Sequence, residues 1–159
     1  MSKLSLKEKA TNYETMLHIQ QVQKAVNKLS MLAIERGRVH DRSKLESPEV
    51  EYFSKYTEEL KNLTYNSDEY KACLEKMKPA ISHHYAVNRH HPEHYPDGVA
   101  GMSLVDLIEM VADWWSSAKR QNNGNLRVSL DESCRRFNID AQLMSIIKNT
   151  IEILEEGVE

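Results

Sequence analysis

Histidine has an uneven distribution in this chain. Five of the seven histidines fall between positions 83 and 94. Clustered imidazoles repel one another once protonated, so a purely solvated surface stripe explains the cluster poorly. Neutral imidazole is a common ligand of divalent metals, and the cluster therefore predicts a metal site. A structural zinc site is the main alternative, and it is disfavoured because such sites usually use cysteine ligands.

Helical phase predicts which of these histidines face inward. If residues 83–91 are helical, His84, Asn88 and His91 share one face at spacings of four and seven. His83 and His90 then lie on the adjacent stripe. We therefore expect His84 and His91 to bind a second metal ion, with Asn88 orienting a ligand or substrate.

A histidine followed directly by an aspartate forms the second motif. His40 and Asp41 can place an imidazole nitrogen and a carboxylate oxygen on one ion. His18 and Asp113 are each in phase with an apolar helical stripe and should face inward. Two histidines and two aspartates from three segments would form a nitrogen and oxygen site open to water. The alternative is that an inward histidine only bonds a backbone carbonyl.

Charged residues near these motifs predict substrate contacts. Arg42 and Lys44 lie within one turn of the His-Asp pair and can bind or stabilise a phosphate. Glu109 precedes Asp113 by four residues and is a candidate for proton transfer or for orienting a ligand. Lys119 and Arg120 are weaker candidates for phosphate binding, because cations are favoured at a helix end anyway.

The elements that must position these residues all read as helices. Apolar side chains recur at helical spacing, and no segment reads as a strand. Ser47, Ser67 and Ser103 are predicted N-caps. Gly37 is a predicted C-cap. The expected helices are 6–36, 47 to about 63, 67–91, 103–121, 129–137 and 141–155.

Bulk composition excludes several classes of protein. The chain has 159 residues and a net charge of -3, which predicts one domain over 1–159 and gives no nucleic-acid signal. No apolar run is long enough for a membrane span, and the first residues lack a signal core. Two widely spaced cysteines fit a cytoplasmic protein with reduced thiols.

The motifs resemble the HD-domain metal-dependent phosphohydrolases. The order His18, His40-Asp41, Asp113 is similar to the H…HD…D signature of that superfamily. The segment HDRSK resembles its HD-x-G-K motif, with Ser43 in place of glycine. The stretches HHPE, PDG and ADW resemble the HD-GYP branch, but no Gly-Tyr-Pro follows. The whole pattern is closest to uncharacterised small HD-like proteins of bacteria and phages, over roughly residues 14 to 150.

This resemblance implies an all-α, HD-like helical bundle. Its metal would be held by His18, His40, Asp41 and Asp113, and Lys44 would contact a phosphate. The resemblance carries over less directly to the second-metal ligands, because helical phase alone selects one member of each histidine pair.

The function expected from residues and resemblance is hydrolysis of a phosphomonoester or phosphodiester, in a nucleotide, by a metal-activated water. Asp41, Lys44 and Glu109 are the expected catalytic residues. One or two divalent ions are expected, from among Mn, Fe, Co, Ni, Zn and Mg. A non-catalytic metal or nucleotide-binding module and a di-iron HD-type oxygenase are the alternatives. Substrate identity and oligomeric state stay open.

Overall fold

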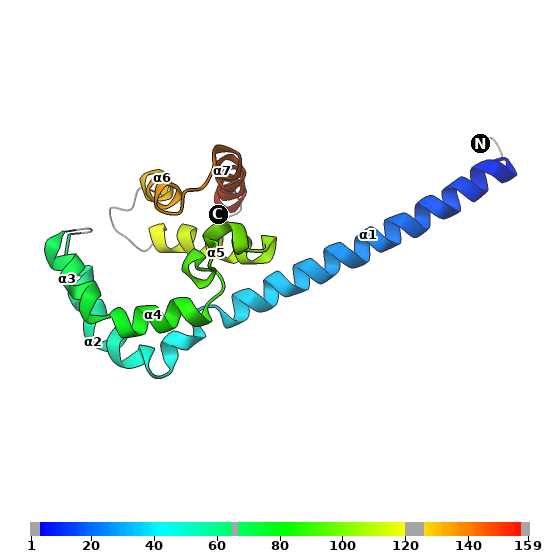
Figure 1. Ribbon diagram of the computed structural model, residues 1–159. Helices are drawn as coiled ribbons and strands as arrows, with labels where there is room; N and C mark the ends of the chain where they lie inside the picture. The colour runs from blue at the N-terminus through cyan, green and yellow to red at the C-terminus, as the bar shows by residue number, and fades with distance from the viewer. Residues whose placement is uncertain (1–3, 65–66, 120–125, 157–159) are drawn as a thin grey trace. The chain divides into compact units, whose positions relative to one another are not determined.

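The computed structural model describes residues 4–64, 67–119 and 126–156, and the described residues form only helices and their connections. The chain divides into two compact units, residues 1–38 and 39–159. Figure 1 shows the elements, which confirm the expected all-α class. The α-helices are α1 Leu6–Val39, α2 Glu49–Lys61, α3 Asp68–Lys76, α4 Lys78–Val87, α5 Leu104–Lys119, α6 Leu126–Arg136 and α7 Ala141–Glu156; the 3-10 turns are η1 Arg42–Leu45, η2 Pro92–His94 and η3 Gly98–Gly101.

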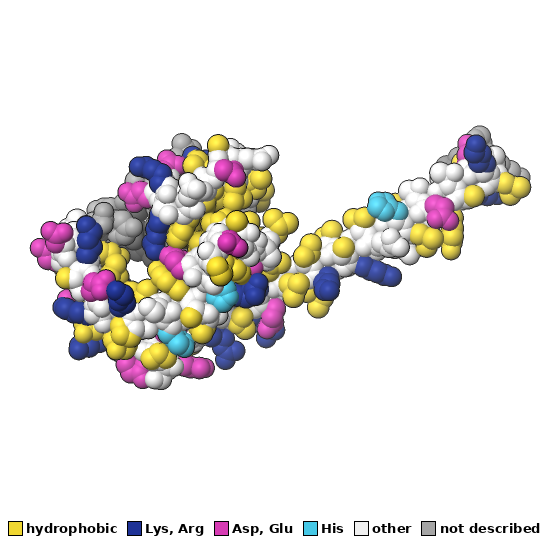
Figure 2. Space-filling model, viewed as in Figure 1, with side chains coloured by type: hydrophobic (Ala, Val, Ile, Leu, Met, Phe, Trp, Pro, Cys, Tyr) yellow, Lys and Arg dark blue, Asp and Glu magenta, His cyan; other side chains and the backbone are white. Residues whose placement is uncertain are grey.

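Helix α1 supplies almost all of the first unit. Ser5 and Glu8 form a reciprocal cap at its start, with each side chain accepting the other residue's backbone N–H. The predicted stop at Gly37 is wrong, because the helix continues to Val39. Asp41 instead has the left-handed conformation that ends a helix, with φ 56°. Figure 2 shows many apolar side chains on the visible face of α1.

Helix α2 begins one residue later than a serine cap requires. Pro48 is the N-cap, and Ser47 caps nothing, so that prediction is wrong. The carbonyl of Glu46 accepts the backbone N–H groups of both Glu49 and Val50 at 3.0 Å. These bonds satisfy the helix start without a side chain. As a result the buried Glu49 opens α2 and faces the protein interior.

The helix expected over 67–91 is two helices. Ser67 caps α3 as predicted, accepting the Tyr70 N–H at 3.1 Å. The helix is interrupted at Met77 because Pro79 has no N–H and cannot continue an α-helix through its own position. Helix α4 then ends at Val87, and Asn88 is extended. Residues 88–91 are therefore not helical, which removes the geometric basis of the predicted His84, Asn88 and His91 face.

Helix α5 carries the acidic side of the site and packs on α6 and α7. The predicted cap at Ser103 is confirmed as a capping box, with Asp106 accepting the Ser103 N–H at 2.9 Å. Trp114 stacks on Phe137 of the α6 end, with ring centroids 5.9 Å apart. The buried core beside α5 consists of Met110, Val111, Leu130, Cys134, Ile139, Ile147 and Ile151. This apolar packing fixes the rotation of α5 and thus the direction of its acidic residues.

Candidate metal centre

Seven histidine, aspartate and glutamate side chains meet inside the unit of residues 39–159. They come from the segment before η1, from α4 and the turn after it, and from α5. Most are buried or half-buried. The possible metal ligands among them form three overlapping groups: Asp41, His84, His90 and His91; His40, Asp41 and Asp113; and His40, His90 and Glu109. Glu49 of α2 contacts the cluster from behind His84.

Asp41 lies between the histidines of the first group. Its Oδ1 atom is 3.3 Å from His84 Nε2 and 3.5 Å from His90 Nε2. His91 Nε2 in turn lies 2.9 Å from His84 Nε2. Three imidazoles thus direct the same ring nitrogen toward one carboxylate oxygen. This is a nitrogen-rich set of the kind that binds Zn, Fe, Co or Ni.

The other carboxylate oxygen of Asp41 belongs to a second, more acidic group. Asp41 Oδ2 is 3.4 Å from His40 Nε2, and Asp113 Oδ1 is 3.7 Å from that same nitrogen. Because Asp41 offers one oxygen to each group, it can contribute to two neighbouring ions. The structure brings together three of the four predicted ligands, His40, Asp41 and Asp113.

The donor spacing fits a metal ion. Two ligands about 2.1 Å from one ion are about 3.0–3.4 Å apart in octahedral or tetrahedral geometry. The measured separations of 2.9–3.7 Å span that range. Asp41 Oδ1 and His90 Nε2 are also buried and have no hydrogen-bond partner among the described residues. Buried polar atoms without partners are costly, and a cation between them would satisfy both.

Electrostatics keep the carboxylates of the centre ionised. Burial alone raises the pKa of Asp41, but the close contact with His84 and the ion pair with Lys44 outweigh burial and hold that pKa well below its usual value. Burial also raises the pKa of Asp113, and hydrogen bonding with His40 reverses the shift. Both groups are therefore anionic ligands at neutral pH.

Two histidines are shifted in opposite directions. The carboxylates of Asp113 and Glu109 raise the pKa of His40 to about 9. Burial, followed by repulsion from the protonated forms of His90 and His84, lowers the pKa of His91 to about 3. His91 is therefore neutral near pH 7, which is the form that coordinates a metal.

The residues predicted to contact substrate are dispersed. Lys44 forms an ion pair with Asp41 and lies beside the centre, over the Phe53 ring. Arg42 is exposed on η1. Asn88 donates to Ser43 Oγ at 2.8 Å and to the His84 carbonyl at 2.9 Å, so it ties the end of α4 to η1.

The remaining predicted residues lie further from the centre or in the other unit. Lys119 is at the end of α5, six residues and about 9 Å along the axis from Asp113, with its ammonium 4.0 Å from the Trp115 ring centroid. Arg120 is outside the described residues. His18 is exposed on α1 in the unit of residues 1–38, so its role as a ligand stays a prediction.

Sequence reasoning missed two members of the cluster. It preferred His91 over His90, whereas both face the centre, because Asn88 is extended and residues 89–90 form a turn and not a helix. It also did not select Glu49, since an acid in the first helical turn is usually explained by the helix dipole. The signal that could have found Glu49 is the adjacent pair His83 and His84. Two neighbouring imidazoles can both contact one carboxylate, and Glu49 lies in the acidic first turn of the preceding helix α2.

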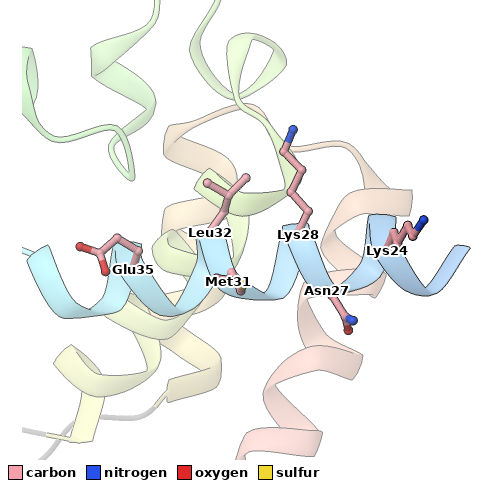
Figure 3. Close-up of a pocket in the computed structure, with 6 residues that line it drawn as sticks. All are labelled: Lys24, Asn27, Lys28, Met31, Leu32 and Glu35. Carbon is pink, nitrogen blue, oxygen red and sulfur yellow. The ribbon is translucent and has the colours of Figure 1, made fainter. Parts of the chain in front are cut away.

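A separate pocket is lined by side chains of α1. Figure 3 shows its six lining residues, which include no histidine and only one carboxylate. They are Lys24, Asn27, Lys28, Met31, Leu32 and Glu35. This pocket contains none of the predicted site residues, and the metal-ligating chemistry is found in the other unit.

The helices and the cluster define an all-α protein with a buried histidine and carboxylate centre suited to a divalent cation. The chain belongs to a family of unknown function, DUF5662, whose model matches residues 7–156. Comparisons with curated proteins and with solved structures found no match. Within the described residues, no helix is both long enough and apolar enough to span a membrane.

Proposed function

We propose that this protein is a metal-dependent phosphohydrolase that cleaves a phosphomonoester or phosphodiester of a nucleotide. The observation that carries the proposal is Asp41, whose two oxygens face two adjacent sets of ligand atoms while Lys44 lies alongside. The H…HD…D order of the sequence, similar to HD-domain phosphohydrolases, supports the choice of reaction.

Each of the two ligand sets would hold one cation. His84, His90 and His91 with Asp41 would hold one ion, and His40, Asp113 and the other oxygen of Asp41 would hold a second. When bound, such ions supply a water of lowered pKa and offset the charge of a phosphate. The burial of His84 and His90 and the partial burial of Asp41 limit bulk water, which strengthens charge interactions in the centre.

Lys44 is the residue best placed to bind the phosphate from the protein side. Its ammonium group lies at the edge of the centre and is held there by Asp41 and the face of Phe53. An ammonium has three donors and can keep one on Asp41 while offering another to a phosphate oxygen. Lys44 would thereby stabilise the charge that develops on the phosphoryl group as the ester bond breaks.

The test begins with the metal content of the purified full-length chain, measured by inductively coupled plasma mass spectrometry. Metal-free protein is then reloaded with Mn, Co, Ni, Zn or Mg and screened for phosphate release from nucleoside mono-, di- and triphosphates and for phosphodiester cleavage. We expect activity with at least one transition metal and none in chelator. The matched control is Asp131→Asn, which alters an exposed aspartate paired with Lys148 on α7.

The other outcomes point to other functions. Tight metal binding without turnover of any phosphoester would overturn hydrolysis and favour a binding module. Iron with oxygen uptake would favour an HD-type oxygenase. Failure to bind any divalent metal would contradict the metal centre itself.

A further inference from the structure

Two buried glutamates lie behind the metal-facing histidines, each in contact with two imidazoles. Glu109 Oε1 is hydrogen-bonded to His40 Nδ1 at 2.9 Å and contacts His90 Nδ1 at 3.1 Å without hydrogen-bond geometry. Glu49 lies 2.8 Å from His84 Nδ1 through one oxygen and 2.8 Å from His83 Nδ1 through the other. Glu49 is fully buried and Glu109 is 7% exposed.

These contacts all involve the ring nitrogen that faces away from Asp41. In His40, His84 and His90, Nδ1 faces a glutamate and Nε2 faces Asp41. A neutral imidazole carries its proton on one nitrogen and a lone pair on the other. A carboxylate accepts hydrogen bonds and cannot donate them, so it favours the tautomer protonated at Nδ1. That tautomer leaves the Nε2 lone pair directed at the centre.

We propose that Glu109 and Glu49 are positioning residues that orient His40, His90 and His84 for metal binding and, in the neutral rings, favour the tautomer protonated at Nδ1. This inference rests on the proposed metal-dependent function; it makes the orienting role expected for Glu109 specific and adds a role for Glu49, which lies outside the predicted ligand set. Carboxylates that accept the second N–H of a ligand histidine raise its basicity, and their loss commonly weakens metal binding 10- to 100-fold.

The two glutamates differ in how they use their oxygens. Glu109 contacts two ligand histidines through Oε1, with a hydrogen bond to His40, so a glutamine at this position can keep that acceptor oxygen. Glu49 serves one ligand, His84, and spends its other oxygen on His83, which is 38% exposed and outside the ligand groups. The structure therefore predicts that the acceptor oxygen of Glu109 matters more than its charge.

The experiment measures tautomers and metal binding separately. Long-range ¹H–¹⁵N NMR on the metal-free full-length chain reports which ring nitrogen of His84 and His90 is protonated, after assignment with single-histidine variants. We expect protonation at Nδ1 in the wild type. A dominant Nε2-protonated form of both residues would overturn the proposal without any metal being present.

Metal binding is followed with Co²⁺, whose visible absorption reports the number of nitrogen ligands. Relative to wild type, Glu109→Leu and Glu49→Leu should each raise the Co²⁺ Kd roughly 10- to 100-fold and change the spectrum. Glu109→Gln should stay within about 10-fold of wild type, at the weak limit of that range. Glu75→Leu, at an exposed glutamate of α3, is the control and should leave both readouts unchanged.

The outcomes separate this inference from the proposed function. Wild-type Kd and spectrum in folded Glu109→Leu and Glu49→Leu would overturn the positioning role even if the enzyme is active. If a leucine variant fails to fold, the protonated ring nitrogen seen by NMR in the wild type and the Co²⁺ Kd of Glu109→Gln still test the positioning role. Wild-type protein that binds Co²⁺ but hydrolyses nothing would contradict only the hydrolase proposal.

Discussion

His84 and His91 point their Nε2 atoms at each other across 2.9 Å although they do not share a helix. His84 is in the last turn of α4, whereas His91 follows the extended Asn88 and precedes η2. Residues 89–90 between them form a turn, in which the His91 N–H donates to the Asn88 carbonyl at 3.4 Å, and His90 faces the same centre. Two lone-pair-bearing nitrogens at this distance require either a shared proton or a shared cation.

Asp41→Ala should abolish phosphate release while keeping the helical fold. Asp41 contributes one oxygen to each ligand group, so its loss weakens both sets at once. The fold should persist because the apolar core beside α5 does not include Asp41. A phosphate-release assay across Mn, Co, Ni and Mg, with circular dichroism as the folding control, checks this. Equal release by wild type and variant would refute the role of Asp41.

Metal should raise the thermal stability of the wild type but not of Asp41→Ala. A ligand that binds only the native state stabilises it by about 2.7 kcal/mol at a concentration 100 times its Kd. Differential scanning calorimetry with and without Co²⁺ or Mn²⁺, and again after chelation, measures the effect. An equal rise in Tm for both proteins would place the bound ion elsewhere on the chain.

His90→Ala and His83→Ala form a matched pair of histidine substitutions. His90 Nε2 faces Asp41 and is buried, whereas His83 lies outside the ligand groups and contacts Glu49. Removing a ligand should weaken metal binding more than removing an orienting group does, so His90→Ala should weaken Co²⁺ binding by more than about 100-fold. His83→Ala should stay below about 10-fold. Isothermal titration calorimetry distinguishes them, and the reverse order would contradict the assignment.

Asp106→Asn should destabilise the protein in a pH-dependent way. Burial alone raises the pKa of Asp106, but hydrogen bonds from Arg89 and Ser103 outweigh burial and hold that pKa below its usual 3.8. A lowered folded pKa contributes stability above the unfolded value, and that stability is lost as the pH falls through the folded pKa. We expect a loss of about 2 kcal/mol at pH 7 that shrinks below about pH 4. Urea denaturation at pH 7, 5 and 3 measures it, and a pH-independent difference would argue against this ion pair.

Ile147→Ala should lower stability without changing the metal centre. Ile147 is 2% exposed in the core between α5 and α7, and it contributes no ligand. Truncating a buried isoleucine leaves a cavity and costs about 2–5 kcal/mol. Chemical denaturation should show this loss while the Co²⁺ spectrum of the folded variant matches the wild type. A changed spectrum would mean that core packing controls the position of Asp113 and Glu109 more tightly than expected.

Much of the local structure followed from the sequence. The capping residues Ser67 and Ser103 set where α3 and α5 begin. The 3.6-residue apolar period sets which face of α5 packs on the core. The His40-Asp41 pair and the inward phase of Asp113 were likewise readable, because each depends on neighbours a few residues away. The predictions at Gly37 and Ser47 were wrong for two different reasons. Asp41, in the left-handed conformation, ends α1 in place of Gly37, and the Glu46 carbonyl accepts the first N–H groups of α2 in place of the Ser47 side chain.

The composition of the metal centre needed the tertiary structure. By itself, the sequence determined an all-α chain with a histidine cluster, a His-Asp motif and an inward aspartate. It did not determine that His90 joins His84 and His91, because that depends on the extended backbone at Asn88 breaking the helical phase. Nor did it determine that Glu49 and Glu109 accept the N–H groups of His84 and His40, because the members of these pairs are separated by 35 and 69 positions in the sequence. Such contacts depend on how helices pack, and the short-range periodicity of a sequence carries no information about them.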